Sequence, residues 1–236
     1  MFLDPYCSQT NGLVAVSARQ ASHFAKGLAG DFNPIHDEEA RKFCVPGDLL
    51  FALVLARYGV FSTMDFRFLG TVGDGVGLIF PPEPAPAFDV VNDRGKPLLA
   101  VRLAGASSQD PVFAETLTRE YVAFSGQNFP HILVPLMADK GVMINPARPL
   151  VMYESMALSF DTLAIGEVRL TLSDTSLTVD GKRGDVRLYF DIHSGDQVVG
   201  SGMKRLALGG LQPYDEGAMA EVIARYEASK AAYRRW

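Results

Sequence analysis

The longest run of apolar residues in the chain spans residues 49–56, within a segment (48–60) that carries charge only near its ends. An α-helix that is apolar on all sides is buried, so this segment predicts a core helix. Beyond it the period falls to two, because Met64, Phe66 and Phe68 alternate with charged residues, as in a strand with one buried face. Further strands are predicted over residues 76–80, 87–91 and 98–104. We therefore expect a core helix wrapped by an antiparallel sheet.

The two ends of the chain predict one helix each. A short strand over residues 13–16 precedes Ser17, which can cap a helix that runs to Leu28. Residues 214–236 form an amphipathic pattern with acidic residues early and Lys230, Arg234 and Arg235 late, an order that suits the helix dipole. We expect this last helix to be a docking appendage rather than a third domain.

The second half of the chain repeats landmarks of the first half in the same order. Residues 30–34 return as 126–130, residues 66–74 as 158–167, and residues 95–96 as 195–196, at nearly constant spacing. Such self-similarity indicates a duplicated architecture. The boundary falls in a polar stretch closed by Pro111, so we expect domains over residues 1–108 and 112–210, followed by the helix over residues 214–236.

Charge and composition exclude several classes of protein. The 236 residues carry 22 Lys and Arg against 27 Asp and Glu, a formal net charge of −5, which offers no basic surface to attract a nucleic acid. No apolar run reaches the roughly 18 residues that a membrane span requires, and the N-terminal residues lack a secretory pattern. We therefore expect a cytoplasmic protein without a membrane partner, with Cys7 and Cys44 as reduced structural thiols.

Residues 29–36 form the loop that could carry chemistry. Asp31 and His36 are five positions apart, and Pro34 prevents a helix between them, while Gly30 permits a tight bend. An imidazole can take or give a proton at neutral pH, and a nearby carboxylate can fix its tautomer or share the proton. A purely structural interpretation, with Asp31 as a helix cap and His36 on the surface, remains open at this point.

This loop, together with Phe24, Ala25 and residues 46–50, resembles the signature of the MaoC-like (R)-specific enoyl-CoA hydratases. The resemblance covers residues 12–106 and implies a hotdog fold, in which a curved antiparallel sheet wraps a central helix. With the repeat, it implies an α+β double hotdog, with two such sheets, each wrapping a central helix, and the C-terminal helix.

The resemblance also implies a reaction. The protein would be a lyase of fatty acid metabolism that adds water to a trans-2-enoyl thioester or removes it from an (R)-3-hydroxyacyl thioester. Asp31 and His36 would be the catalytic dyad, Asn33 would orient the water, and the backbone N–H of Gly47 would bind the thioester oxygen. No metal and no cofactor would be needed, because the substrate arrives on coenzyme A or on an acyl carrier protein.

The chain departs from the family pattern in three places. Only ten residues separate His36 from Gly47, which shortens the segment that shapes the substrate entrance, and Pro46 and Asp48 replace the usual His and Met. Asp48 could modulate the site, since a carboxylate there could cap the helix and compete for the donors that face the oxyanion. In the second half, Gln127 replaces the acid and His131 comes one residue early, so we expect an inactive loop with a partly buried structural histidine.

Two other functions remain open. One is a non-catalytic protein that binds acyl thioesters, and the other is a structural interaction module that uses residues 214–236. Expected partners are an acyl thioester and, as a further candidate, an acyl carrier protein, and the expected assembly is a monomer or a homodimer of double hotdogs. We assign His23 and His193 to structure, and the glycine-rich residues 73–77 to a strand connection, because they do not open a helix.

Overall fold

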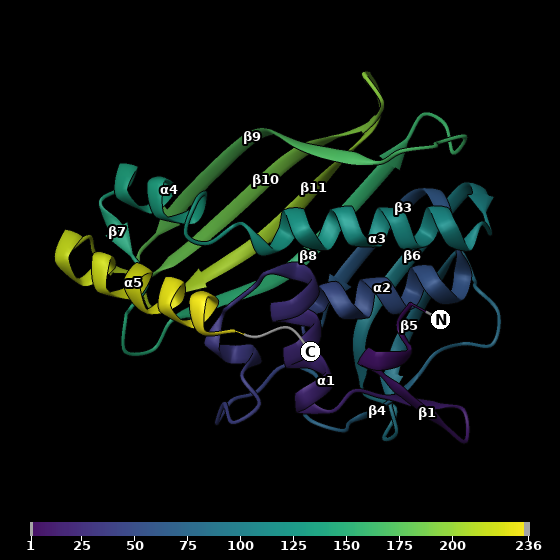
Figure 1. Ribbon diagram of the computed structural model, residues 1–236, viewed down its shortest axis with the longest axis horizontal. Helices are drawn as coiled ribbons and strands as arrows, with labels where there is room; N and C mark the ends of the chain where they lie inside the picture. Colours follow the sequence, from purple (N-terminus) through teal and green to yellow (C-terminus); the bar gives the residue numbers. More distant parts are fainter. Residues whose placement is uncertain (1, 234–236) are drawn as a thin grey trace.

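The computed structural model describes residues 2–233 and shows an α+β fold built on one large antiparallel sheet (Figure 1). The ten strands of this sheet are β1 (Ser8–Thr10), β2 (Leu13–Ala15), β3 (Val60–Phe68), β4 (Gly77–Ile79), β5 (Ala87–Asn92), β6 (Pro97–Ser108), β8 (Leu150–Phe160), β9 (Arg169–Asp180), β10 (Arg183–Ser194) and β11 (Gln197–Gly209). A small second sheet pairs β7 (Val142–Met143) with β12 (Gln212–Pro213). The helices are α1 (Ala18–His23), α2 (Gly47–Tyr58), α3 (Pro111–Gly126), α4 (Leu133–Asp139) and α5 (Glu216–Ala232).

The strands of the two halves follow the same order in the large sheet. Along the large sheet the order is β1-β2-β4-β5-β6-β3-β8-β11-β10-β9. Outward from the centre, one half places its strands in the order β3, β6, β5, β4, and the other half in the corresponding order β8, β11, β10, β9. β3 and β8 meet antiparallel at this central seam, where Met64 faces Leu158 and Phe66 faces Met156. The sequence predicted two separate sheets, and that detail is wrong, because the pairing of β3 with β8 joins both halves into one sheet.

Helices α2 and α3 pack side by side on one face of the sheet (Figure 1). The predicted core helix is α2, whose apolar run is buried on all sides, and the rings of Phe51 and Tyr121 join it to α3 with centroids 4.9 Å apart. α3 begins where the sequence placed the boundary, with Asp110 as its cap and Pro111 in its first turn. In the second half the long helix, α3, therefore precedes the repeated loop, and α4 is the short helix between that loop and β8.

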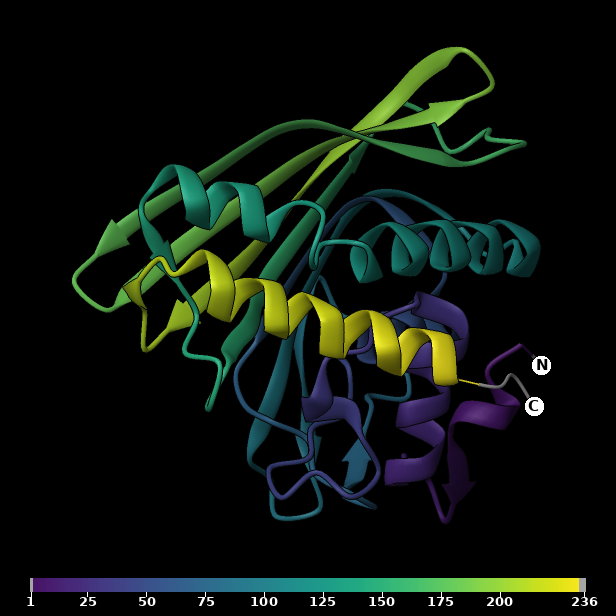
Figure 2. The same ribbon diagram turned by 60° about the vertical axis from the view of Figure 1, so that its left-hand side comes forward.

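The N-terminal helix and the C-terminal helix both approach the loop that contains Asp31. Ser17 caps α1 as predicted, and the chain continues as a π-helical segment (Phe24–Ala29) before Gly30. α5 leaves the second half and crosses to the first half (Figure 2), so the predicted terminal helix is present over Glu216–Ala232, while Arg234 and Arg235 lie outside the described residues. Within residues 2–233, no helix is long and apolar enough to cross a membrane.

Candidate functional site

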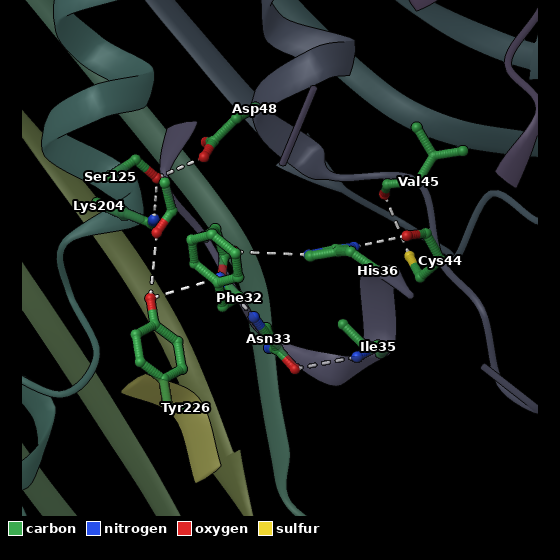
Figure 3. A network of polar contacts seen from close by, with 12 residues as sticks. Phe32, Asn33, Ile35, His36, Cys44, Val45, Asp48, Ser125, Lys204 and Tyr226 are labelled. Carbon is green, nitrogen blue, oxygen red and sulfur yellow. Dashed lines mark hydrogen bonds and ion pairs between the residues drawn. The ribbon is translucent and has the colours of Figure 1, made fainter. Parts of the chain in front are cut away.

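The Asp31 loop is held by hydrogen bonds from its own side chains. Gly30 ends the π-helical segment with a left-handed φ of 69°, a conformation that glycine adopts without strain. The Asp31 carboxylate accepts a hydrogen bond from the backbone N–H of Asn33 at 2.8 Å. The side-chain oxygen of Asn33 accepts one from Ile35 N–H at 3.2 Å (Figure 3). The short 3-10 turn Pro34–His36 then returns the chain. Asn33 thus orients the loop itself.

This turn brings His36 to Asp31. The Nδ1 atom of His36 lies 2.6 Å from the carbonyl oxygen of Cys44, and because a carbonyl oxygen only accepts hydrogen bonds, Nδ1 carries the proton. In the neutral imidazole, Nε2 is therefore the unprotonated nitrogen, and it lies 3.7 Å from Asp31 Oδ2. That separation is too long for a direct hydrogen bond. A small polar group such as water could therefore interact with both atoms.

Gly47 begins α2, next to this pair. Pro46 is the N-cap residue and no side chain caps this helix, so the unpaired N–H groups of the first turn keep their partial positive charge. A Cβ at Gly47 would lie 2.9–3.0 Å from the rings of Tyr153 and Phe68, so a side chain there would force these rings to shift. The prediction that the Asp48 carboxylate caps this helix is wrong, because it points instead to the second half of the protein.

Asp48 forms a buried network with two residues that the sequence analysis missed. Its Oδ2 accepts a hydrogen bond from Ser125 Oγ at 2.5 Å, and Ser125 Oγ in turn accepts one from Lys204 Nζ. Burial raises the pKa of Asp48, opposed by the charge of Lys204. Burial lowers the pKa of Lys204, opposed by the charge of Asp48. The alternation of β11 was one sequence signal for Lys204, because Lys204 lies on the same buried face of the strand as Leu206 and Leu208.

The C-terminal end of α3 closes against the Asp31 loop. A Cβ at Gly126 would overlap the carbonyl oxygen of Ala29, so only glycine permits this contact between the halves. Asn128 follows in the turn after the helix, where its backbone N–H bonds to the carbonyl of Ser125. Its side chain is 5% exposed, and neither its amide oxygen nor its amide nitrogen has a hydrogen-bond partner among residues 2–233. The sequence gave no reason to select Asn128.

These groups line one cavity of about 680 Å³. Its wall combines the Asp31 loop and the start of α2 with residues of the second half such as Leu133, Ile144 and Leu206, so apolar surface surrounds a few polar side chains. α5 completes the wall through Val222 and Tyr226. The Tyr226 hydroxyl donates to the carbonyl of Gly30 at 3.2 Å and accepts from Phe32 N–H at 3.4 Å, and burial raises its pKa to about 12.

The two residues of the second half that correspond to the predicted catalytic pair lie outside this cavity. Gln127 and His131 are both exposed, and neither lines the cavity, so the prediction of a partly buried His131 is wrong. His193 bonds to Thr171 Oγ1 at 2.7 Å. Cys7 and Cys44 are free thiols, and no group of acidic, His and Cys side chains within the described range is placed to hold a metal ion.

A comparison with family models matches residues 1–217 to the family described as "Protein of unknown function (DUF3581)". The chain belongs to the DUF3581 family. A search of curated proteins found no match to this DUF3581 member.

Several solved structures resemble this DUF3581 chain at low sequence identity. The acyl-CoA thioesterase II TesB2 from Mycobacterium marinum has 14% identity and a TM-score of 0.43, with 92% of this chain and 98% of that chain covered. A conserved protein of unknown function with a hot dog fold from Alicyclobacillus acidocaldarius has 9% identity and a TM-score of 0.44, with coverages of 91% and 99%. A MaoC-like dehydratase has 10% identity and a TM-score of 0.43, with coverages of 85% and 97%.

Proposed function

We propose that this protein is a hydro-lyase that adds water to a trans-2-enoyl thioester or removes it from an (R)-3-hydroxyacyl thioester. The observation that carries the proposal is the pairing of His36 Nε2 with Asp31 Oδ2 at 3.7 Å at the edge of a largely apolar cavity of about 680 Å³. The resemblance of residues 29–36 to the MaoC-like signature supports it. We also propose that the fold is a double hotdog with domains over residues 1–108 and 112–210, since the strand order repeats outward from the β3–β8 seam.

The proposed reaction follows from the tautomer of His36. Because Nδ1 donates to Cys44, the free lone pair of Nε2 can take a proton from a water molecule that Asp31 orients. The water oxygen then adds to C3 of the enoyl group, and negative charge moves to the thioester oxygen. The N–H of Gly47 at the start of α2 would stabilise this charge. The protonated imidazole then gives its proton to C2 on the same face, which makes the addition syn, and dehydration follows the reverse course.

The structure disfavours one of the two alternative functions and is compatible with the other. A free docking helix is disfavoured, because α5 is engaged by Tyr226 with the Asp31 loop and forms part of the cavity wall. A non-catalytic protein that binds acyl thioesters would use the same largely apolar cavity, so a measurement of turnover distinguishes it from the hydro-lyase. Within the proposal, coenzyme A and an acyl carrier protein remain equivalent carriers.

The test is an assay of crotonyl thioester hydration, in which the loss of ultraviolet absorbance by the enoyl group measures the reaction. We expect turnover by the wild type and a decrease of roughly 10²–10⁴-fold in His36→Ala, the range that a general acid–base group supplies. His131→Ala is the matched control, because this exposed histidine lies in the repeated loop outside the cavity. Turnover by His36→Ala within a few-fold of the control would contradict the proposal, and saturable thioester binding without turnover would favour the non-catalytic alternative.

A further inference from the structure

Besides Ser125, three buried polar side chains line the cavity without belonging to the Asp31 loop. Asp48 is 6% exposed, Asn128 is 5% exposed and Lys204 is 4% exposed. They come from the start of α2, the turn after α3 and the middle of β11, so both halves of the chain contribute. The proposed hydration mechanism uses none of them.

The hydrogen bonds of these three residues are incomplete on the protein side. Ser125 occupies Oδ2 of Asp48 and accepts one N–H of Lys204. Oδ1 of Asp48 and both polar atoms of the Asn128 amide have no partner among the described residues. Buried polar atoms are almost always satisfied. A polar ligand group that enters this space could satisfy them, whereas a purely apolar acyl chain would leave them unpaired.

The charges of the cluster restrict which group can satisfy it. The unpaired oxygen of Asp48 requires a donor and repels a carboxylate or a phosphate. The ammonium of Lys204 and the NH₂ group of Asn128 require an acceptor, and the ammonium repels an amine. A hydroxyl group is neutral and small, and it both donates and accepts. The bonds through Ser125 hold Asp48 and Lys204 in place before a ligand arrives.

We propose that Asp48, Asn128 and Lys204 form a subsite for a hydroxyl group on the acyl chain of the substrate, in addition to the hydroxyl that hydration adds or dehydration removes. The inference rests on the proposed function for the class of substrate, an acyl thioester. It defines that class further, as hydroxylated acyl thioesters rather than plain alkyl ones. A site that hydrogen-bonds a substrate hydroxyl discriminates strongly against the analogue without it, because its polar groups are then left unpaired.

The experiment measures binding by titration calorimetry of a matched series of coenzyme A thioesters. The series contains hexanoyl-CoA and its 4-, 5- and 6-hydroxy derivatives. For the wild type we expect at least one hydroxylated thioester to bind about tenfold more tightly than hexanoyl-CoA, or better, as one hydrogen bond to a charged group provides. In Asn128→Leu we expect this preference to shrink to a few-fold or less. Gln127→Leu is the matched control, because Gln127 is exposed in the same turn and does not line the cavity.

Thermal unfolding separates binding from a structural role of Asn128. Since the Asn128 amide has no partner among residues 2–233, Asn128→Leu should melt at the same temperature as the wild type or higher, whereas loss of a structural contact would lower it. If Asn128→Leu does not fold, Asn128→Ala provides the second test. It removes both polar atoms of the amide with a smaller side chain, so the hydroxyl preference should again fall.

Four outcomes would overturn the inference. They are equal binding of plain and hydroxylated thioesters by the wild type, a preference that survives both substitutions, an equal loss of affinity for plain and hydroxylated thioesters in Asn128→Leu, and no binding of any thioester. Hydration of a crotonyl thioester is measured separately. A hydroxyl preference without hydration would refute the proposed reaction and keep the subsite, whereas hydration without a preference would refute the subsite alone.

Discussion

The stability of the protein should depend on pH in opposite ways when Asp48 or Lys204 is replaced by an apolar residue. In the protein both charges are buried and are joined through Ser125. Removing one member of a buried pair leaves the other uncompensated, which costs about 3–5 kcal/mol. For a chain of this length, that corresponds to a decrease in melting temperature of roughly 6–20 °C. We expect decreases in this range at neutral pH for Asp48→Met and for Lys204→Met.

The sign of the pH dependence follows from the pKa of the residue that remains. In Lys204→Met, burial still raises the pKa of Asp48, and the opposing charge of Lys204 is gone. A group whose folded-state pKa is raised contributes stability at low pH and loses it as pH rises through the folded pKa, so the stability of this variant should approach that of the wild type as pH falls toward the unfolded-state pKa of about 3.9. In Asp48→Met, burial still lowers the pKa of Lys204. A group whose folded-state pKa is lowered contributes stability at high pH and loses it as pH falls, so the stability of this variant should approach that of the wild type as pH rises toward the unfolded-state pKa of about 10.4.

The double variant completes the cycle. Replacing a buried ion pair by apolar side chains of similar size is nearly neutral or stabilising, so Asp48→Met with Lys204→Met should melt near the wild type at neutral pH. The assay is thermal unfolding of the four proteins at about pH 5, 7 and 10. Parallel pH profiles for the two single variants, or additive losses in the double variant, would refute the electrostatic argument. We expect no gain in turnover from Asp48→Met, because its carboxylate bonds to Ser125 rather than to the start of α2.

Three further expectations concern the Asp31 loop and its supports. Asp31→Asn should lower the rate of hydration by roughly 10²–10⁴-fold. Adding His36→Ala should lower this rate little more, because the effects of residues that act as a unit are not additive. A steady-state rate of the double variant that is lowered by the product of the two single effects would contradict a shared role. Gly126→Ala should lower the melting temperature, since a methyl group would overlap the carbonyl of Ala29, and an unchanged melting temperature would show that the contact is loose. Tyr226→Phe removes both hydroxyl contacts to the loop and should cost about 1–3 kcal/mol of stability in denaturant unfolding. Its turnover should fall more than that of the control Tyr189→Phe, because Tyr189 is a half-buried tyrosine of β10 that does not line the cavity.

The parts of the fold that local patterns determine could be predicted from the sequence. The apolar run of α2, the alternation in β3 and the cap of α1 by Ser17 each depend on neighbouring residues. The approach of His36 to Asp31 is local too, since both lie within one loop whose own side chains fix it. Their roles in catalysis stay a prediction.

The other half of the site depends on contacts that no local pattern encodes. Asp48 meets Ser125 and Lys204 only because the pairing of β3 with β8 brings the two halves into one sheet. From the sequence alone, an acidic residue at the start of α2 is interpreted as a helix cap, and that interpretation is wrong. Likewise, nothing near Asn128 in the sequence shows that its amide lies in a cavity whose other wall comes from the first half.

The β3–β8 seam also describes how the protein could be taken apart and reassembled. A cut just before Asp110 would leave β3 as a bare edge on one fragment and β8 on the other, with unpaired N–H and C=O groups on each. Because both fragments order their strands in the same way outward from that edge, each could pair with the other or with a copy of itself. In the intact chain, the covalent link fixes which two edges pair. Tethering lets one copy of the loop keep Asp31 and His36 while the other copy, with Gln127 and His131, is released from that constraint.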